Sequence, residues 1–325
     1  MKRTAFILFL IFIANLAFGQ QMPLFSQYLY NKFLINPAVA GNDGYTSVSL
    51  TAREQWVGYS GAPRTFAFSV QTRMLKRSYI LKQTSVKRQT FRPKSDGKVG
   101  LGGYVFSDRN GLVQRTGFQF AYAYHMWLQK STQLSLGLSV TGYQYKINEK
   151  LINFEDPNEP WLNNNLRRGM FVPDMTFGVS LINEKYNFGF SADQLLEASA
   201  KIGNSAYENF RIKRQYYLFG SYDFSSGAYN VIQPSFMMMM SEQFKPQADI
   251  GVTFIYNHDF WSGLALRTSG AIIANVGVKY QNIFIGYAFD FTLSEIQRIT
   301  YGTHEITFAL KFGDNTRRYR WLDRY

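Results

Sequence analysis

The 325-residue sequence contains no cysteine and only three histidines, at positions 125, 258 and 304. A chain without cysteine has no thiol nucleophile, no disulfide and no thiolate zinc site. The sequence patterns of zinc metalloproteases, P-loop proteins, serine hydrolases and dinucleotide-binding proteins are also missing. His304 lies beside a carboxylate, Glu305, but no nucleophile accompanies the pair. We therefore expect no enzyme activity, no metal site and no cofactor.

Long hydrophobic runs are missing as well, apart from one near the start. Lys2 and Arg3 precede an apolar run from Ala5 to Ile13, and Ala17-Phe18-Gly19 follows. This order is typical of a secretory signal peptide, which predicts cleavage after residue 19. A membrane anchor is the alternative, but the run is shorter than the roughly 20 residues of a spanning helix. No later run reaches that length, so a helical membrane protein is excluded.

An exported chain without disulfides needs a large core or a closed sheet for stability. The composition favours the sheet, because 17% of the residues are aromatic and 26 are glycine. After Gly44 the sequence repeatedly forms segments of about ten residues in which apolar and small polar residues alternate, the length and period of a transmembrane β-strand. Fourteen such segments cover residues 45–56, 64–75, 98–107, 113–127, 131–145, 173–183, 185–194, 212–223, 229–240, 246–257, 260–268, 271–281, 283–292 and 303–312.

A soluble sandwich would also bury one face of each strand and expose the other. Two features favour a membrane barrel. Aromatic residues such as Trp127 and Tyr143 lie near strand ends, where a bilayer interface accommodates them. Short and long links alternate, and only the links at 76–97 and 269–270 break this rule. We predict an all-β fold, a transmembrane antiparallel β-barrel of about 14 strands over residues 45–312, with the N-terminus and the short links in the periplasm.

Residues 20–44 show neither a period of two nor a capped helix pattern. We expect an ordered N-terminal segment that is periplasmic or plugs the barrel, since fourteen strands enclose more space than their own side chains fill. Under this hypothesis, five residues of the segment form the plug or a partner-binding surface. The alternative is that the segment only completes the packing of the barrel. These residues are Phe25, Gln27, Asn31, Asn36 and Pro37.

Four charged residues fall on strand faces that otherwise carry small polar residues. Arg53 alternates with Ser49 and Thr51, and the same rule places Arg267, Asp290 and Glu305 on the lumen face. The first, thirteenth and fourteenth strands become neighbours when the barrel closes. We therefore predict an ionic cluster in the outer half of the lumen, formed by Arg53, Asp290 and Glu305 with Arg267 close by.

The net charge of +13 is unevenly distributed. The link 76–97 holds seven basic residues against one acidic residue, and the tail 313–325, expected in the periplasm, is also basic. Export argues against nucleic acid as the partner. An acidic periplasmic partner and a solvated insertion both remain open. The link 146–172 is rich in carboxylates but lacks calcium-loop spacing, which indicates a solvated surface loop.

Several blocks of the sequence resemble the PorP/SprF family, outer-membrane components of the type IX secretion system. The basic link is the main departure from the family pattern. A FadL-like barrel is one architecture that fits the fourteen strands. The blocks are Phe25-Ser26-Gln27-Tyr28 with Asn31, Asn36-Pro37-Ala38-Val39-Ala40-Gly41, Arg53-Glu54-Gln55-Trp56, Ala62-Pro63-Arg64-Thr65, Leu266-Arg267-Thr268-Ser269-Gly270, Gly286-Tyr287-Ala288-Phe289-Asp290 and Gly302-Thr303-His304-Glu305-Ile306.

The resemblance implies a place in the outer membrane of a gram-negative bacterium of the Bacteroidota. It also implies a role: to capture, anchor or display secreted proteins, such as gliding adhesins, through their C-terminal sorting domain. The implied partners are outer-membrane lipids, the secreted cargo, and periplasmic or lipoprotein components of the secretion machine. A passive or hydrophobic-substrate channel is the alternative that the same barrel would support.

Overall fold

The computed structural model describes residues 25–28, 30–74, 98–129, 131–147, 169–197, 199–200, 210–211, 213–227, 229–242 and 246–312. The expected signal peptide (1–19), the basic link (76–97), most of the carboxylate-rich link (146–172) and the basic tail (313–325) lie outside these residues. Among the described residues, no helix has the length and apolarity needed to cross a membrane.

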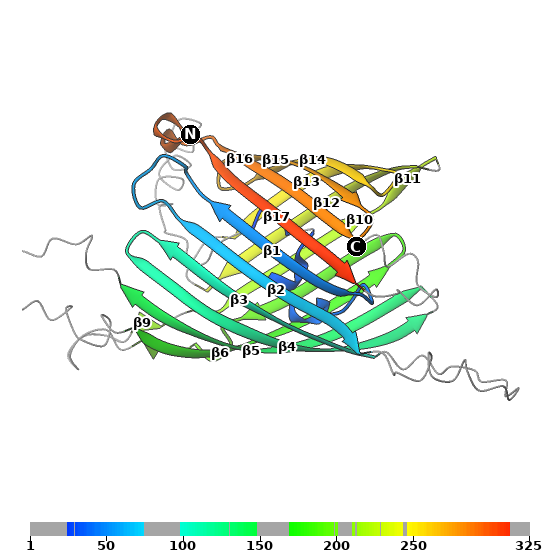
Figure 1. The fold of residues 1–325 in the computed structure, drawn as a ribbon, viewed down its shortest axis with the longest axis horizontal. Coiled ribbons are helices and arrows are strands. Elements are labelled where there is room, and N and C mark those ends of the chain that lie inside the picture. The colour runs from blue at the N-terminus through cyan, green and yellow to red at the C-terminus, as the bar shows by residue number, and fades with distance from the viewer. Residues whose placement is uncertain are drawn as a thin grey trace, which may run out of the picture.

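Within the described residues, fourteen long antiparallel strands form a closed barrel (Figure 1), which confirms the predicted fold class. The strands are β1 (Thr46–Glu54), β2 (Arg64–Met74), β3 (Val99–Asn110), β4 (Val113–Gln129), β5 (Thr132–Ile147), β6 (Met170–Asn183), β7 (Tyr186–Asp193), β10 (Gln215–Tyr222), β12 (Asn230–Ser241), β13 (Gln247–Tyr256), β14 (Phe260–Arg267), β15 (Ala271–Tyr280), β16 (Ile283–Thr292) and β17 (Thr303–Phe312). Shorter elements are β8 (Ser199–Ala200), β9 (Phe210–Arg211), β11 (Phe224–Ser226) and the 3-10 helices η1 (Lys32–Leu34), η2 (Pro37–Val39) and η5 (Glu295–Ile299).

The barrel closes where the first strand meets the last. β1 pairs with β17 over its whole length, from Thr46 opposite Phe312 to Glu54 opposite His304. Elsewhere each long strand pairs with its neighbours in chain order, and the three-residue β11 pairs only with β12. Closure gives the strand backbones hydrogen-bond partners in a medium that offers no water.

The two ends of the barrel differ in their connections. At the short-turn end, where β1 begins and β17 ends, the links include 184–185, 257–259 and 281–282. At the opposite, long-loop end the links include 55–63 and 293–302. β6 begins at Met170, three residues before the predicted start, because Met170 still pairs with Tyr145 at the extended end of β5. Backbone pairing thus continues past the point where the apolar alternation becomes weak.

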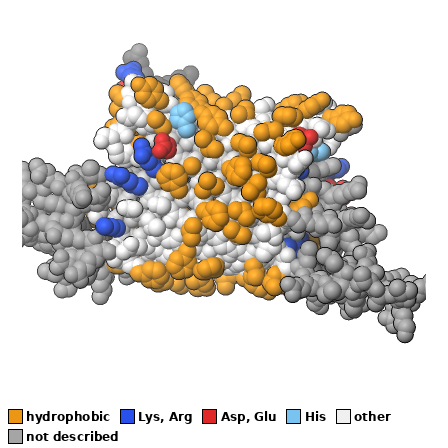
Figure 2. Space-filling view, viewed as in Figure 1, with side chains coloured by type: hydrophobic (Ala, Val, Ile, Leu, Met, Phe, Trp, Pro, Cys, Tyr) orange, Lys and Arg blue, Asp and Glu red, His pale blue; other side chains and the backbone are white. Residues whose placement is uncertain are grey.

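Apolar and polar side chains separate onto the two faces of the wall. On β5, Leu136, Leu138 and Val140 are 38%, 45% and 53% exposed, whereas Ser135 and Ser139 are buried. Figure 2 shows hydrophobic side chains spread over the middle of the outer face, with charged side chains towards the two ends. This distribution suits a barrel whose outer belt contacts lipid.

Residues 25–28 and 30–42, hereafter the lumen segment, lie inside the barrel between its walls (Figure 1). The segment is irregular except for η1 and η2. Pro37 occupies the first position of η2, where its missing N–H costs nothing. The side chain of Asn36 caps the same helix by accepting a hydrogen bond from the N–H of Ala38 at 2.9 Å. Local capping therefore holds a turn that is too short to be stable alone.

Candidate functional site

Five charged side chains meet in the long-loop half of the lumen. The guanidinium of Arg53 on β1 donates to Glu305 Oε2 on β17 and to Asp290 Oδ2 on β16, both at 2.8 Å. Arg267 on β14 donates to the same Asp290 oxygen at 3.0 Å. All these side chains are almost fully buried. The four residues singled out from the sequence therefore lie in one hydrogen-bonded group. Together with Asp249, they are called the charge cluster below.

Asp249 on β13 is the member that the sequence reasoning did not name. Arg267 Nη2 lies 2.7 Å from Asp249 Oδ2, and Arg267 Nε donates to both carboxylate oxygens. The alternation of Gln247, Asp249 and Thr253 on one strand face was the signal that could have found it. Two arginines and three carboxylates give the cluster a formal charge of 2 − 3 = −1, so further donors stabilise it.

The lumen segment supplies those donors. Glu305 accepts hydrogen bonds from the backbone N–H groups of Ser26 at 2.7 Å and Gln27 at 2.9 Å. The hydroxyl of Ser26 donates to Asp290 Oδ2 at 2.6 Å and accepts from Arg53 Nη1 at 2.7 Å. The amide of Gln27 donates to the backbone oxygen of Glu305 at 2.9 Å. The beginning of the lumen segment is therefore bonded directly into the charge cluster.

The middle of the lumen segment is held by its asparagines. Asn31 donates from its side chain to Thr51 Oγ1 on β1 at 3.3 Å. Asn36 donates to two wall carbonyls, Val179 at 2.9 Å and Phe190 at 3.1 Å. These two carbonyls belong to facing residues of β6 and β7. A buried amide that satisfies two strands at once fixes the position of the segment across the barrel.

The end of the lumen segment is bonded to the wall near the short-turn end. His125 on β4 bonds through Nε2 to the carbonyl oxygen of Ala40 at 3.0 Å. The amide of Gln133 on β5 donates to Asn42 Oδ1. The next residue, Asp43, forms an ion pair with Lys311 on β17 at 3.1 Å. The segment is thus tied to the wall at both ends and in the middle.

Glycines in the wall allow the backbone of the lumen segment to approach closely. A Cβ at Gly137 would meet the backbone of Ala38, and one at Gly100 would meet the carbonyl of Ala40. A Cβ at Gly178 would meet the side-chain oxygen of Asn36. The wall is therefore shaped to the segment at several points, as expected where two backbones lie in contact.

Apolar side chains fill the space between these polar anchors. Tyr28 and Ile35 pack with Phe219 and Met237 on β10 and β12. Phe33, which has no exposed surface, packs on the opposite side against alanines of β4 and edge-on to Tyr104. Burial of an aromatic ring contributes on the order of 2 to 3 kcal/mol. The lumen segment thus acts as the hydrophobic core of the barrel.

Of the five segment residues predicted from the sequence, four are buried against the wall: Gln27, Asn31, Asn36 and Pro37. Phe25 differs, since it is half-buried and lines a cavity of about 60 Å³ with Tyr104 and Tyr217. The wall residues of this cavity lie in the long-loop half of the barrel. The surface of the segment that remains accessible there is therefore apolar and includes Phe25.

His304 and Glu305 point to opposite sides of β17. Glu305 enters the charge cluster, whereas His304 lies on the outer side, bonded to the hydroxyl of Tyr287 at 2.7 Å and to the carbonyl of Tyr301 at 3.1 Å. The adjacency seen in the sequence therefore places no base beside a carboxylate. In the part of the chain that the structure describes, no group of three or more His, Asp or Glu is arranged to hold a metal ion.

The model of one protein family matches residues 17–310, and its description is "Type IX secretion system membrane protein PorP/SprF". Among curated proteins, none matches this sequence. Similar solved structures include the toluene transporter TodX of Pseudomonas putida, with 7% identity and a TM-score of 0.46, covering 86% of this chain and 93% of that chain. A TodX deletion mutant described as a monoaromatic hydrocarbon channel has 9% identity and a TM-score of 0.48, covering 88% and 94%. The KdgM porin has 8% identity and a TM-score of 0.37, covering 82% and 99%.

Proposed function

Because the chain belongs to the PorP/SprF family of type IX secretion system membrane proteins, we propose that it captures, anchors or displays secreted proteins at the cell surface through their C-terminal sorting domains. The family and the fold are those of a secretion-system membrane barrel, and they fit the outer membrane. Membership implies interaction with the secretion machinery and its cargo.

The filled lumen is the observation that carries this proposal. A passive pore needs a continuous water path, but residues of the lumen segment bond to β1, β4, β5, β6, β7, β16 and β17 across the interior. Such a barrel is suited to present a surface to a partner. We therefore favour docking over the alternative of a passive or hydrophobic-substrate channel.

In this proposal the lumen segment is a plug whose long-loop side contributes to the docking surface. Support comes from the half-buried Phe25, which lines the cavity beside Tyr104 and Tyr217. Asp108, Arg115 and Asp193 form the charged part of the same lining. Aromatic side chains in a partly desolvated pocket are the usual anchors of protein interfaces. The buried Gln27, Asn31, Asn36 and Pro37 act by holding the plug in place.

The orientation follows from the lengths of the links. Short turns of outer-membrane barrels face the periplasm and longer loops face outward. The proposal accordingly places the short-turn end in the periplasm, where periplasmic or lipoprotein components of the machine would bind. Cargo would meet the long-loop end, above the charge cluster.

Two measurements test the proposal together. Protein purified in detergent from its host after brief crosslinking should carry a large exported protein with a C-terminal sorting domain. In planar bilayers the same preparation should be electrically silent. A stable ohmic pore with no exported protein bound would favour the channel and contradict docking. A Phe25→Ala variant tests the docking surface itself, with Phe224→Ala as the control, because Phe224 is exposed on β11 at the other end of the barrel.

A further inference from the structure

A second cavity, of about 120 Å³, lies between the lumen segment and the wall at the short-turn end. Its lining runs from Gln27 in the middle of the lumen to His258 in the turn between β13 and β14. His258 is partly exposed, so the cavity reaches solvent at this end. Neither the charge cluster nor Phe25 borders it.

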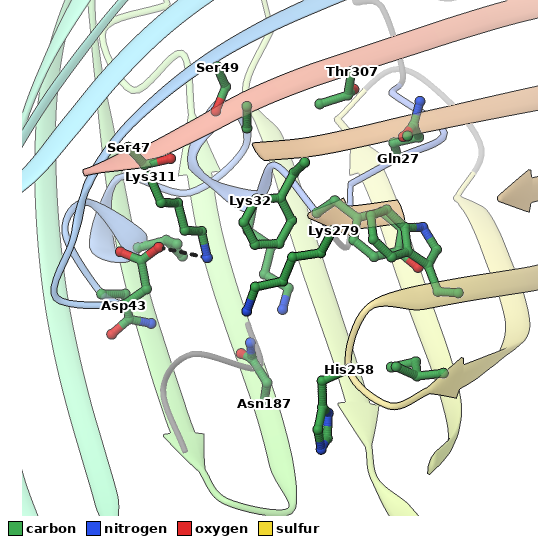
Figure 3. A pocket seen from close by; sticks show the side chains of 18 of the residues that line it. Gln27, Lys32, Asp43, Ser47, Ser49, Asn187, His258, Lys279, Thr307 and Lys311 are labelled. Carbon is green, nitrogen blue, oxygen red and sulfur yellow. Dashed lines mark ion pairs between the residues drawn. The ribbon is translucent and has the colours of Figure 1, made fainter. Parts of the chain in front are cut away.

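Three lysines from three different elements line this cavity. Lys32 comes from the lumen segment, Lys279 from β15 and Lys311 from β17. Figure 3 shows their amino groups pointing into the same space, with Asn187 across from them. Lys32 is 7% exposed, and Asp223 in the same lining supplies negative charge that favours its ammonium form.

A single aromatic ring positions two of the three ammonium groups. Lys311 Nζ lies 4.6 Å from the centre of the Phe284 ring, and Lys279 Nζ lies 5.3 Å from it. Cation–π contacts at these distances hold a lysine without neutralising it. The two like charges are therefore kept on one wall of the cavity.

The carboxylates of the cavity leave a positive excess. Asp43 pairs with Lys311 at 3.1 Å, and Asp223 accepts a hydrogen bond from Gln233 at 2.7 Å. Three lysines and two aspartates give 3 − 2 = +1 with His258 neutral. One monoanionic group balances this charge, whereas a phosphate dianion would exceed it.

Two further observations concern the shape and polarity of a group that would suit this cavity. The indole N–H of Trp261 is buried, lines the cavity and finds no acceptor among the described residues. Val39, Val231, Ile255 and the Tyr30 ring stacked on Trp261 form an apolar part of a lining that also includes neutral polar side chains such as Ser47, Gln71 and Asn187. A donor that lacks an acceptor, beside an apolar wall, matches a carboxylate carried on an apolar body.

We propose that this cavity is a binding site for an organic monocarboxylate with an apolar body, which enters from the short-turn end. The carboxylate lies among Lys32, Lys279 and Lys311 and accepts a hydrogen bond from the indole N–H of Trp261. A free aromatic or aliphatic acid and the carboxyl-terminal apolar residue of a peptide share this chemistry.

The protonation of Lys32 agrees with such a ligand. Burial lowers the pKa of Lys32 to about 8, Asp223 opposes this effect and Lys311 adds to it. A bound carboxylate favours the charged amine and restores the pKa towards its ordinary value. Binding near pH 8 to 9 should therefore be accompanied by proton uptake. The other charged or titratable groups that line the cavity are Asp43, Lys279 and His258.

Calorimetric titration of the whole detergent-solubilised protein tests the site with four probes: phenylacetate, the peptide Gly-Gly-Gly-Phe with a free carboxyl terminus, the same peptide as its amide, and inorganic phosphate. Both acids should bind and the amide should bind at least tenfold more weakly. Tighter binding of the peptide acid identifies a chain terminus as the source, and equal binding identifies a free acid. Equal binding of the amide, tighter binding of inorganic phosphate, or no binding of either acid at 10 mM would overturn the proposal.

Variants locate the binding within the cavity. Lys279→Gln should weaken binding of the acids about tenfold or more, whereas Lys185→Gln, at an exposed turn on the same end of the barrel, should leave it unchanged. Trp261→Phe keeps an aromatic ring but removes the indole N–H, so binding should weaken several-fold. Heat-modifiable migration of each variant on gels shows that its barrel is intact. Equal effects of Lys279→Gln and Lys185→Gln would also overturn the proposal.

Discussion

Arg53 and Glu305 face each other as Cα partners across the seam where the first and last strands join, and their side chains are 2.8 Å apart. Their exposed side-chain fractions are 2% and 0%. Glu305 also accepts hydrogen bonds from the backbone N–H groups of Ser26 and Gln27. One contact at the seam that closes the barrel therefore also anchors the lumen segment.

Replacing Arg53 with methionine should strongly destabilise the barrel. The substitution keeps an unbranched apolar stem but removes the guanidinium, which leaves Asp290 and Glu305 buried without their shared partner. Breaking a buried ion pair from one side costs about 3 to 5 kcal/mol. The free energy of unfolding in urea, measured in detergent micelles, gives this value directly.

The control for that experiment is Arg64→Met on the neighbouring strand. Arg64 pairs with Glu54 at 3.3 Å, but the two side chains are 60% and 41% exposed. An exposed pair contributes about 0 to 1 kcal/mol. Similar losses in the two variants would show that the charge cluster does not hold the seam.

Adding one methyl group at Gly100 should displace the lumen segment. A Cβ at this position meets the backbone oxygen of Ala40, which has no side-chain freedom with which to move aside. The Gly100→Ala barrel should still insert, but it should conduct ions in planar bilayers. Gly103→Ala is the matched control on the same strand, since its nearest neighbour is the carbonyl oxygen of Gln119 at 3.1 Å and belongs to the wall. Silence of both variants would mean that the segment tolerates the methyl group.

Asn36→Ala should loosen the lumen segment while leaving the wall folded. The variant loses the two hydrogen bonds to the carbonyls of Val179 and Phe190 and the cap on Ala38. Leaving buried polar groups unsatisfied costs about 1 to 3 kcal/mol each. Limited proteolysis should therefore cut the segment faster than in Asn282→Ala, a control at an exposed turn. Equal cleavage rates would contradict the role assigned to Asn36.

The pH dependence of stability should report the buried Lys32. Its pKa is lowered from 10.5 to about 8 by burial, so between pH 8 and pH 10.5 the unfolded chain binds the proton that the folded chain has lost. Stability therefore rises with pH in this window. Each pKa unit corresponds to about 1.4 kcal/mol. Lys32→Met should have a larger free energy of unfolding than the wild type at pH 7, and this difference should be smaller at pH 9.5. A difference that does not change with pH would contradict the prediction.

Most of the wall could be predicted from the sequence. Alternation along a strand has a period of two, so Leu136 and Ser135 each show which face they occupy without knowledge of the partner strand. The ends of strands were less certain, and β6 begins at Met170 because its pairing with Tyr145 does not depend on apolar alternation. The dispersed PorP/SprF blocks were sufficient for the family, which the match over residues 17–310 establishes.

The interior was harder to predict. Alternation assigns Arg53, Arg267, Asp290 and Glu305 to the lumen face, but it does not measure distances across the lumen between strands that are not neighbours. Asp249 is a different case, since it faces Arg267 directly on the neighbouring strand, where alternation and strand pairing could have found it. The lumen segment has no period, so its path and the wall glycines that accommodate it follow only from three-dimensional packing.

The cavity with the three lysines had no counterpart in the sequence reasoning. Lys32, Lys279 and Lys311 are far apart in the chain, and none belongs to a run of basic residues. The closed barrel alone brings them together. Signals of this kind require the structure, since neither composition nor spacing contains them.

The most direct test of the central claim is the location of exported cargo in a host strain that lacks this protein and has no related barrel. Surface proteomics and immunodetection should find proteins with the type IX C-terminal sorting domain in the medium or inside the cell, and no longer on the surface. Wild-type protein should restore display, and Gly103→Ala should restore it equally well. Normal display of these proteins in the strain without the barrel would contradict the account.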